Sequence, residues 1–353
     1  MTIKFKIGDL ISNPDYLLYG INPARSELIF LEVTRETYRN STFLDERISR
    51  TRDRVHGFDL EEVVNAMSQV PTRSKPVHYI FHTAFCCSTL LAKSLDFENR
   101  TMSLREPMVF TNLANAKRIL KKKDQFDTEY WQNMVNISVK LLNKVYNPEE
   151  QVIVKATNMA NNVAADALNV NRDSKAILLT SSLESYIASN IKKKDEALEK
   201  IPLIAKFFSM DSDYIDHFPE LKLPDLDFLQ RIIFAWHIQR YMFMQLVENF
   251  GQNRVRTMDA DELLDRSFDS LQAARDFLDL DIPDKMLREK IGSNVWHRDA
   301  KSPEKPFNRT VRAADYAEIL DHNRTLIDDA IGWSAMLQDG VPVADPLPSP
   351  LLG

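Results

Sequence analysis

The stretch VHYIFHTAFCCSTLLAKSL, residues 77–95, decides the fold. It opens with a short apolar run, Val77–Phe81, whose length and content of β-branched and aromatic residues are typical of a buried strand. A compact turn follows, and Ser88 and Thr89 then lead into leucines at helical spacing. The first amides of a helix lack backbone partners, and the helix dipole favours an anion there. A strand, loop and helix in this order are therefore suited to cradle a phosphate.

The sequence pattern of the ATP-binding P-loop, GxxxxGK[ST], is absent from this stretch. It would require glycines at positions 81 and 86 and a lysine at 87, where the chain has Phe81, Cys86 and Cys87. That lysine contacts the β and γ phosphates, so its absence disfavours an ATP-dependent phosphotransferase, which we keep as a third hypothesis. The same residues also fit an ordinary strand–helix corner in which Ser88 caps the helix, and this interpretation stays open.

The composition is that of an ordinary globular protein. The chain has 353 residues, of which 44% are hydrophobic and 27% are charged, and its net charge is −6. This charge disfavours a general nucleic-acid binder. No apolar run approaches the roughly 20 residues of a membrane span, and the start MTIKFKIGDL has no signal-peptide core. The only cysteines, Cys86 and Cys87, suit reduced thiols, so we expect a cytoplasmic protein with neither nucleic acid nor membrane as partner.

Strands and helices alternate along the rest of the chain. After the opening strand, buried strands are predicted at 101–104, 151–154, 175–180 and 254–258, with helical patterns between them. This order predicts an α/β fold with a mostly parallel central sheet and helices on both faces.

Prolines and composition suggest three segments. Pro71 and Pro76 mark a boundary ahead of the first central strand. We therefore predict an N-terminal extension over 1–75, the central domain over 76–297, and an irregular C-terminal segment with a poorly ordered tail over 298–353. Within the extension, a strand near 28–33 and a helix near 59–67 are predicted.

Charged residues follow two of the predicted strands. Arg105 and Glu106 come after 101–104, and Lys155 ends the strand at 151–154. Ligands of open α/β sheets lie beyond the carboxyl ends of the strands, so these side chains are candidates for a site. Each is equally compatible with a solvated strand end.

Hydroxyl and basic residues form further clusters that have two interpretations. Ser181 and Glu184 fit a helix capping box, and the hydroxyls of Ser182, Ser185 and Ser189 share one helix face. Such clusters either contact an anionic ligand or lie on a solvated surface. The basic clusters consist of Lys192–Lys194, of Arg47, Arg50, Arg52 and Arg54, and of Arg298, Lys301, Lys305 and Arg309.

Taken together, residues of about 76–285 resemble the sulfotransferases that use 3′-phosphoadenosine-5′-phosphosulfate (PAPS) as donor. Cys86–Leu91 stands in the place of the first family motif, and Lys155–Thr157 is similar to its lysine-threonine-proline element. Ser189 fits the serine of the second motif, and Arg254–Leu264 is similar to the closing strand and acidic turn.

The chain departs from the family pattern at two cations. Phe85 replaces the basic residue of the loop, and Ser181 replaces the arginine that binds the 3′-phosphate. His82, Lys155, Lys192 and the C-terminal arginines and lysines are candidates to compensate. The departures keep open an alternative function, that of a non-catalytic nucleotide-binding or interaction protein on the same fold.

The resemblance implies a three-layer P-loop-type fold and the transfer of a sulfuryl group from PAPS to a hydroxyl or amine of a small-molecule acceptor. It implies that Lys155 lies near the transferred group, with Glu106 as the first and His82 as the second candidate for the base. No metal is required. The acceptor cannot be identified from dispersed loop residues. The implied PAPS-binding residues are Thr83, Ala84, Phe85, Cys86, Cys87, Ser88, Thr89, Ser181 and Ser189.

Overall fold

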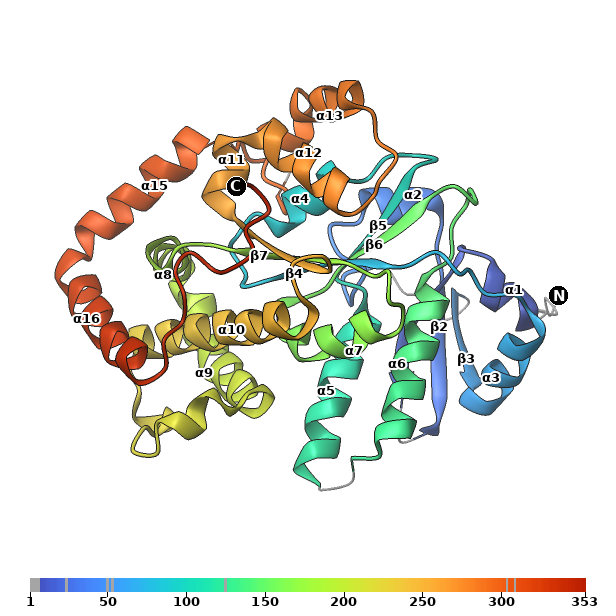
Figure 1. The fold of residues 1–353 in the computed structure, drawn as a ribbon, viewed down its shortest axis with the longest axis horizontal. Coiled ribbons are helices and arrows are strands. Elements are labelled where there is room, and N and C mark those ends of the chain that lie inside the picture. The colour runs from blue at the N-terminus through green and yellow to red at the C-terminus, as the bar shows by residue number, and fades with distance from the viewer. Residues whose placement is uncertain are drawn as a thin grey trace. The chain divides into compact units, whose positions relative to one another are not determined.

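The computed structural model describes residues 7–22, 25–48, 51, 54–123, 126–302, 304–307 and 309–353. Its elements follow one another along the chain as Figure 1 shows. The chain forms two compact units. The first consists of Met1–Ile80, Leu95–Ala176 and Leu278–Ile282, and the second of Phe81–Ser94, Ile177–Phe277 and Pro283–Gly353.

Five strands form the central sheet, in the order β5-β6-β4-β7-β8. β4 and β5 both pair in parallel with β6. The amides of Tyr79 and Thr83 donate to the carbonyls of Lys175 and Leu179, a step of four residues on both strands that a parallel pair of β4 and β7 produces. The strands are β4 (His78–His82), β5 (Thr101–Arg105), β6 (Gln151–Lys155), β7 (Ala176–Thr180) and β8 (Val255–Asp259).

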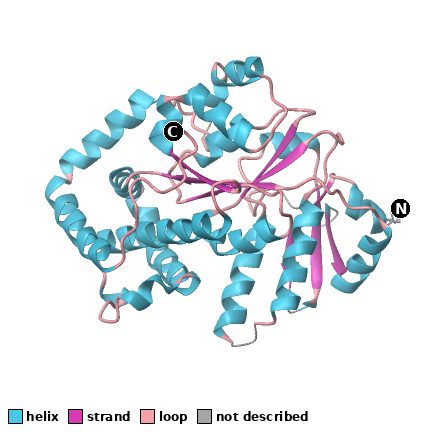
Figure 2. Ribbon diagram, viewed as in Figure 1, coloured by secondary structure: helices cyan, strands magenta, loops and turns pink. Residues whose placement is uncertain are grey.

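The predicted α/β class is confirmed. Every residue of β4, β5 and β7 is buried, which explains the apolar runs Tyr79–Phe81 in β4 and Ala176–Leu179 in β7. Helices flank the sheet on both faces (Figure 2).

The register of the sheet positions the candidate residues at the strand ends of the first unit. Lys155 pairs with Ile80 on one side and with Arg105 on the other, so the carboxyl ends of β4, β5 and β6 meet at one edge. From Ile80 the chain continues through the end of β4 into the loop at 83–87.

The N-terminal residues build a second, antiparallel sheet in the order β1-β2-β3. Its strands are β1 (Tyr16–Asn22), β2 (Glu27–Glu32) and β3 (Val55–Asp59). The strand and helix expected in this region are found as β2 and α3, whereas β1 and β3 were not predicted. The remaining helices of the first unit are α1 (Ile7–Ser12), α2 (Arg35–Asn40), α3 (Leu60–Gln69), α5 (Met108–Lys122), α6 (Thr128–Leu142), α7 (Ala164–Asn169) and the short 3-10 helix η3 (Asn158–Val163).

The second unit is mostly helical. Its longest helix, α10, has 23 residues and buries Ile232, Ile233 and Trp236 among others. Its other helices are α4 (Ser88–Ser94), α8 (Leu183–Lys192), α9 (Lys194–Asp211), η4 (Asp213–His217), η5 (Leu223–Asp225), α10 (Phe228–Phe250), α11 (Ala260–Asp265), α12 (Ser267–Phe277), α13 (Asp284–Ile291), α14 (Asn294–His297), α15 (Arg309–His322) and α16 (Arg324–Gly340).

The C-terminal region differs from the expected irregular segment and disordered tail. α15 and α16 occupy most of 309–340. Beyond them, the amide of Thr257 in β8 donates to the carbonyl of Ser349, and the amide of Leu351 donates back to the carbonyl of Thr257. Proline content suggested disorder, but buried Val343 and Leu347 and the pairing with β8 fix this end of the chain.

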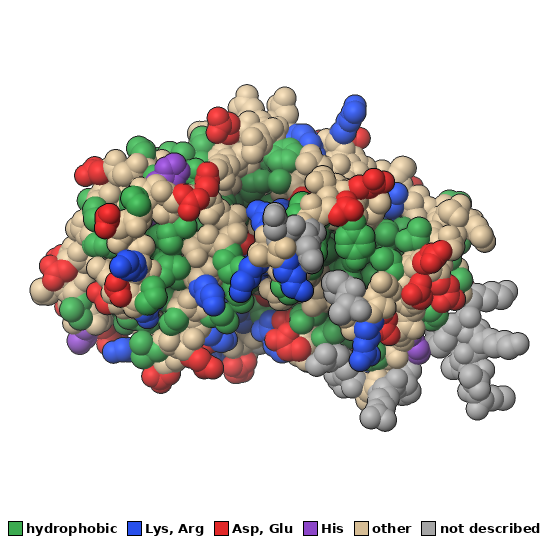
Figure 3. Space-filling model, turned by 90° about the horizontal axis from the view of Figure 1, so that it is seen from below, with side chains coloured by type: hydrophobic (Ala, Val, Ile, Leu, Met, Phe, Trp, Pro, Cys, Tyr) green, Lys and Arg blue, Asp and Glu red, His purple; other side chains and the backbone are tan. Residues whose placement is uncertain are grey.

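Acidic, basic and apolar side chains are interspersed on the face of the molecule shown in Figure 3. Among the described residues, no helix combines the length and the hydropathy that crossing a bilayer requires.

His78 makes the folding stability of the first unit depend on pH. It is 3% exposed, and its Nδ1 accepts a hydrogen bond of 3.1 Å from the amide of Lys175. Burial, assisted by the charge of Lys175, lowers the pKa of His78 from 6.5 to about 4. The unfolded chain therefore binds more protons between these two values, and stability falls as the pH falls through this window, by about 3 kcal/mol in total.

We expect His78→Asn to remove most of this dependence, because an amide oxygen can accept the same hydrogen bond without titrating. Urea unfolding at several pH values between about 4 and 7 measures the effect. The wild-type chain should lose about 3 kcal/mol more than the variant across the window. If the free energy of unfolding depends on pH in the same way for both proteins, His78 does not titrate as described.

Candidate active site

One candidate site, within the first unit, is an ion pair at the carboxyl ends of β5 and β6. Nζ of Lys155, the last residue of β6, donates a hydrogen bond to Oε1 of Glu106, the first residue after β5. The Lys155 side chain is only 1% exposed, and a buried ammonium requires such a partner. Two of the three predicted catalytic residues thus form one pair.

The backbone at Glu106 is strained. Its φ is +50°, a left-handed conformation that costs a non-glycine residue about 1–3 kcal/mol. The amide of Glu106 donates to the carbonyl of Lys155 over 2.6 Å, which holds this conformation against the end of β6. Strain of this kind is concentrated at functional sites, so it supports a role for Glu106 in the chemistry.

The N-terminal segment adds a cation and an aromatic ring to this pair. Arg47 Nη2 lies 3.9 Å from Glu106 Oε2, and Arg47 Nε donates to the carboxylate of Asp45 over 2.8 Å. The ring centroid of Phe43 lies 3.9 Å from Cζ of Arg47 and 5.3 Å from Nζ of Lys155. The ring faces both cations, an arrangement that cation–π attraction stabilises.

Arg105 holds this segment in place. Its side chain is fully buried and donates to the carbonyls of Tyr38, Arg39 and Ser41, while its own carbonyl accepts from the amide of Leu44 over 2.7 Å. Arg105 is therefore a structural residue that fixes the segment carrying Phe43 and Arg47, not a ligand contact.

Only one member of the predicted basic cluster at 47–54 reaches the pair. Arg47 does so, whereas Arg54 donates to the backbone carbonyl of Glu32 over 3.1 Å. Arg50 and Arg52 lie outside the described residues.

A separate candidate site, within the second unit, is formed by the loop between β4 and α4. Ala84, Phe85 and Cys87 have φ values of +72°, +53° and +60°, although none of them is glycine. Left-handed residues in such a turn point successive amides to one side, which makes an anion-binding nest. The amides of Phe85 and Cys87 have no backbone partner among the described residues. The loop thus keeps a phosphate-binding conformation without the glycines of the ATP-binding pattern.

Two amides of the predicted cradle are already used within the chain. The amide of Thr83 donates to the carbonyl of Leu179 over 3.1 Å, and the amide of Ala84 donates to Nδ1 of His82 over 3.0 Å. His82 is 4% exposed and its Nδ1 is occupied as an acceptor, so it braces the loop. Of the two proposed bases, Glu106 fits the geometry better.

A cavity of about 510 Å³ opens beside this loop, entirely within the second unit. Its walls come from the loop and the start of α4, from the end of α8, and from the C-terminal segment with α15. The volume lies in the range of small-molecule and cofactor sites. Predicted residues that line it are Phe85, Cys86, Cys87, Ser88, Thr89 and Ser189.

The described lining of this cavity is strongly basic. Asp299 and Asp315 are its only acidic residues, and six basic residues oppose them. In a low-dielectric pocket such an excess of positive charge favours a ligand with several negative charges. Arg309, which was predicted to join the flap, pairs instead with Asp265. The basic residues are Lys192, Lys193, Arg298, Lys301, Lys305 and Arg312.

Two polar groups in the cavity are buried without a partner. Nη2 of Arg312 and Oγ1 of Thr89 have no hydrogen-bond partner, and the two residues are 8% and 2% exposed. Leaving such groups unsatisfied costs about 1–3 kcal/mol each, and more when the group is charged. Both groups can donate a hydrogen bond to an anion. A bound anionic ligand would therefore explain why they are buried without a partner in the chain.

Arg312 is positioned by its neighbours on α15 and α11. Nη1 donates to Asp261 over 2.7 Å, and the guanidinium lies 5.0 Å from the ring centroid of Tyr316. The Tyr316 hydroxyl in turn lies 2.6 Å from the hydroxyl of Ser189. Arg312, Tyr316 and Ser189 therefore form one polar cluster on the cavity wall.

The other predicted serine is placed differently. Ser181 is fully buried and is not among the residues that line the cavity. The helix cap is also different from the predicted box, because Ser182 rather than Ser181 caps α8, accepting from the amide of Ser185 over 3.2 Å. Ser181 and Ser182 are adjacent, so the sequence alone allows either of them to cap the helix. The backbone at Ser182 has the non-helical conformation that a cap needs.

Cys87 is not a nucleophile at neutral pH. Although part of its surface faces the cavity, desolvation raises the pKa of its thiol to about 12, and the nearby charge of Arg312 offsets this only in part. The thiolate is the reactive form of cysteine. Cys87 is therefore a structural residue of the loop.

Sequence reasoning missed Arg312, Tyr316, Phe43 and Asp45. Arg312 and Tyr316 are four residues apart on a helix and follow a basic stretch, a signal that could have been noticed. Nothing in the local sequence around Phe43 indicates its contact with Lys155, since the two are more than a hundred positions apart.

The unpartnered hydroxyl of Thr89 gives a direct test of the cavity. Thr89→Val keeps the shape but removes the hydroxyl, so the free energy of unfolding should change by less than about 1 kcal/mol. Binding of pyrophosphate, measured by isothermal titration calorimetry, should weaken about tenfold or more, because a hydrogen bond to a charged group is lost. Thr89→Ser is the matched control and should bind as the wild type does. Equal binding by the valine variant would remove Thr89 from the site.

Two solved structures are similar to this chain, and both are sulfotransferases, the family that the sequence resembles. The sulfotransferase domain from the curacin biosynthetic pathway is 12% identical with a TM-score of 0.44, and the match covers 71% of this chain and 98% of that domain. The sulfotransferase STF9 from Mycobacterium avium is 10% identical with a TM-score of 0.39, and the match covers 74% and 80%. No protein-family model and no curated protein sequence matches the chain. At scores and identities this low, the similarity supports no conclusion about activity.

Proposed function

We propose that this protein is a PAPS-dependent sulfotransferase that acts on a hydroxyl or amine of a small-molecule acceptor. The observation that carries the proposal is the basic cavity with two buried, unpartnered donors, Thr89 Oγ1 and Arg312 Nη2. A ligand that satisfies both must be anionic, and the surplus of lining cations favours one with several charges. The absence of the P-loop lysine disfavours ATP as this ligand.

The residues of the cavity fit such a donor. The loop amides with Ser88 and Thr89 would hold the phosphosulfate, as at other strand–loop–helix phosphate sites. Arg312, which Asp261 positions through Nη1, would hold a second phosphate and replace the arginine that is absent at Ser181. When bound, PAPS supplies the sulfuryl group as a mixed anhydride with phosphate.

The ion pair of the first unit supplies the proton transfer. Glu106 would accept the proton of the acceptor hydroxyl or amine as the acceptor atom bonds to sulfur. Its Oε1 is occupied by Lys155, so Oε2 is the oxygen that remains for this step.

A second candidate function, nucleotide binding without catalysis, is favoured by one specific observation. The Nζ of Lys155 is buried and donates to Glu106, so it does not reach a ligand unless this hydrogen bond is exchanged. The cavity would then serve recognition alone. Turnover by the purified protein decides between the two functions.

We expect adenosine 3′,5′-bisphosphate and PAPS, but not AMP or ATP, to raise the melting temperature. A ligand at about 100 times its Kd stabilises the native state by about 2.7 kcal/mol. Arg312→Gln should weaken binding of the bisphosphate by about 10- to 100-fold, since a charged hydrogen bond is lost. Arg309→Gln is the matched control, because Arg309 is on the same helix but pairs with Asp265. A chain that prefers ATP, or an Arg312→Gln variant with unchanged affinity, would contradict this assignment.

Glu106→Gln should lower the rate of sulfate transfer about 100- to 10,000-fold, the usual contribution of a general base, while binding of adenosine 3′,5′-bisphosphate is kept. Transfer from labelled PAPS to a panel of hydroxyl and amine compounds measures the rate. Glu98→Gln removes an exposed carboxylate that pairs with Arg39 and should be neutral. If the wild-type chain binds PAPS but transfers nothing, the non-catalytic function holds. If the Glu106 variant keeps the full rate, another group is the base.

A further inference from the structure

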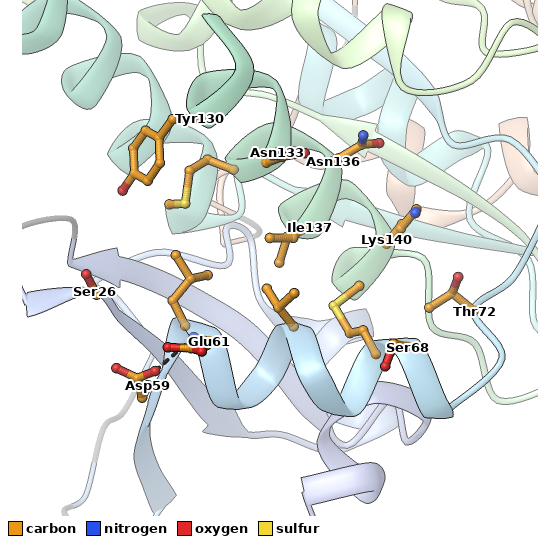
Figure 4. A pocket seen from close by; sticks show the side chains of 14 residues that line it. Ser26, Asp59, Glu61, Ser68, Thr72, Tyr130, Asn133, Asn136, Ile137 and Lys140 are labelled. Atoms are coloured by element: carbon orange, nitrogen blue, oxygen red, sulfur yellow. Dashed lines mark hydrogen bonds between the residues drawn. The ribbon is translucent and has the colours of Figure 1, made fainter. Parts of the chain in front are cut away.

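A second cavity, of about 700 Å³, lies between α3 and α6 within the first unit (Figure 4). Its apolar side chains come from both helices. Val64 and Met67 belong to α3, and Met134 and Ile137 belong to α6. Val64 is 39% exposed, so this apolar surface is open to solvent in the described part of the chain.

Four polar side chains around this groove are available to a ligand. Among the described residues, the side chains of Asn133, Asn136, Lys140 and Glu61 make no hydrogen bond or ion pair. Elsewhere on the same helix, Gln132 donates to Asp166 and Ser138 donates to the carbonyl of Met134. The groove face of α6 therefore presents free donors and acceptors beside apolar side chains.

The groove also has two chemically different ends. Figure 4 shows Glu61 and Asp59 at one end and Lys140 with Thr72 at the other, with Ile137 between them. The carboxylate of Asp59 already caps α3 by accepting from the amide of Glu61 over 2.8 Å, which leaves the carboxylate of Glu61 for a ligand. A complementary ligand carries a basic group at the Glu61 end and an acidic group at the Lys140 end.

The two asparagines indicate which kind of ligand fits. A side-chain amide offers both donors and an acceptor, which matches the N–H and C=O of a peptide group. Residues three apart on a helix are about 5–6 Å apart, close to the spacing of about 6.6 Å between alternate residues of an extended strand. A helical ligand uses its N–H and C=O groups internally and offers nothing to these amides.

We propose that the groove between α3 and α6 binds an extended peptide segment of a partner protein. The segment bonds to Asn133 and Asn136 through its main chain and places alternate apolar side chains against Val64 and Ile137. From Tyr130 to Lys140 the helix axis spans about 15 Å, the length of four to five extended residues. The segment therefore carries a basic residue at one end and an acidic residue at the other, with about four residues between them. This site is independent of the sulfuryl-transfer site.

The probe is a set of fluorescein-labelled hexapeptides with blocked termini, measured by fluorescence anisotropy with the full chain. Lysine and glutamate occupy the two ends, and two alternate central positions carry Val, Ile, Leu or Phe in all combinations, with threonine between them. A second set has glutamine at both ends. We expect saturable binding of members of the first set, and at least about tenfold weaker binding of the same peptides with glutamine ends.

Two variants locate the binding. Val64→Glu should weaken it at least about tenfold, because it places a charge among the apolar side chains. Ile119→Glu is the matched control, since Ile119 is a 53%-exposed apolar residue on α5 that does not line the groove. Lys140→Gln should remove the preference for an acidic residue at its end of the groove without affecting the melting temperature.

Three outcomes would overturn the proposal. They are no binding by any peptide up to about 1 mM, equal loss of binding in the Val64 and Ile119 variants, or a concentration-dependent dimer in light scattering that Val64→Glu disrupts. The last result would mean that a second copy of this chain covers the groove.

Discussion

The buried ion pair between Lys155 and Glu106 is the interaction on which the candidate chemistry depends. The Lys155 ammonium is 1% exposed and is stabilised by the Glu106 carboxylate, and the parallel register of β5 and β6 brings the two residues together. The left-handed backbone of Glu106 and the buried Arg105 then fix the N-terminal segment against this edge, which adds Arg47 and Phe43. One strand register thus determines the partners of the proposed base.

The cavity of the second unit follows a different principle. There the chain collects positive charge and leaves donors buried without partners, a state that costs free energy until an anion completes it. The strained loop at 84–87 belongs to the same arrangement, because non-glycine residues persist in left-handed conformations where their surroundings hold them. In the proposed function, Arg312 from a helix near the C-terminus supplies the cation that the sequence lacks at Ser181.

The central sheet was predictable because each buried strand is a short apolar run, and periodicity records burial directly. The same reasoning found Lys155, Glu106 and the loop, since strand ends are visible in the sequence. It failed where long-range packing decides, as with Phe43 against Lys155, Tyr316 against Ser189, and the C-terminal pairing with Thr257. The cap of α8 was placed one residue early, because Ser181 and Ser182 are chemically equivalent and only backbone conformation separates them.

The most direct test of the account is a crystal structure of the protein with adenosine 3′,5′-bisphosphate. The account predicts that one phosphate lies within hydrogen-bonding distance of Thr89 Oγ1 and the loop amides, and the other within reach of Arg312 Nη2 and Ser189. A structure in which the loop cavity is filled by the chain's own side chains, or in which the nucleotide binds elsewhere, would contradict it.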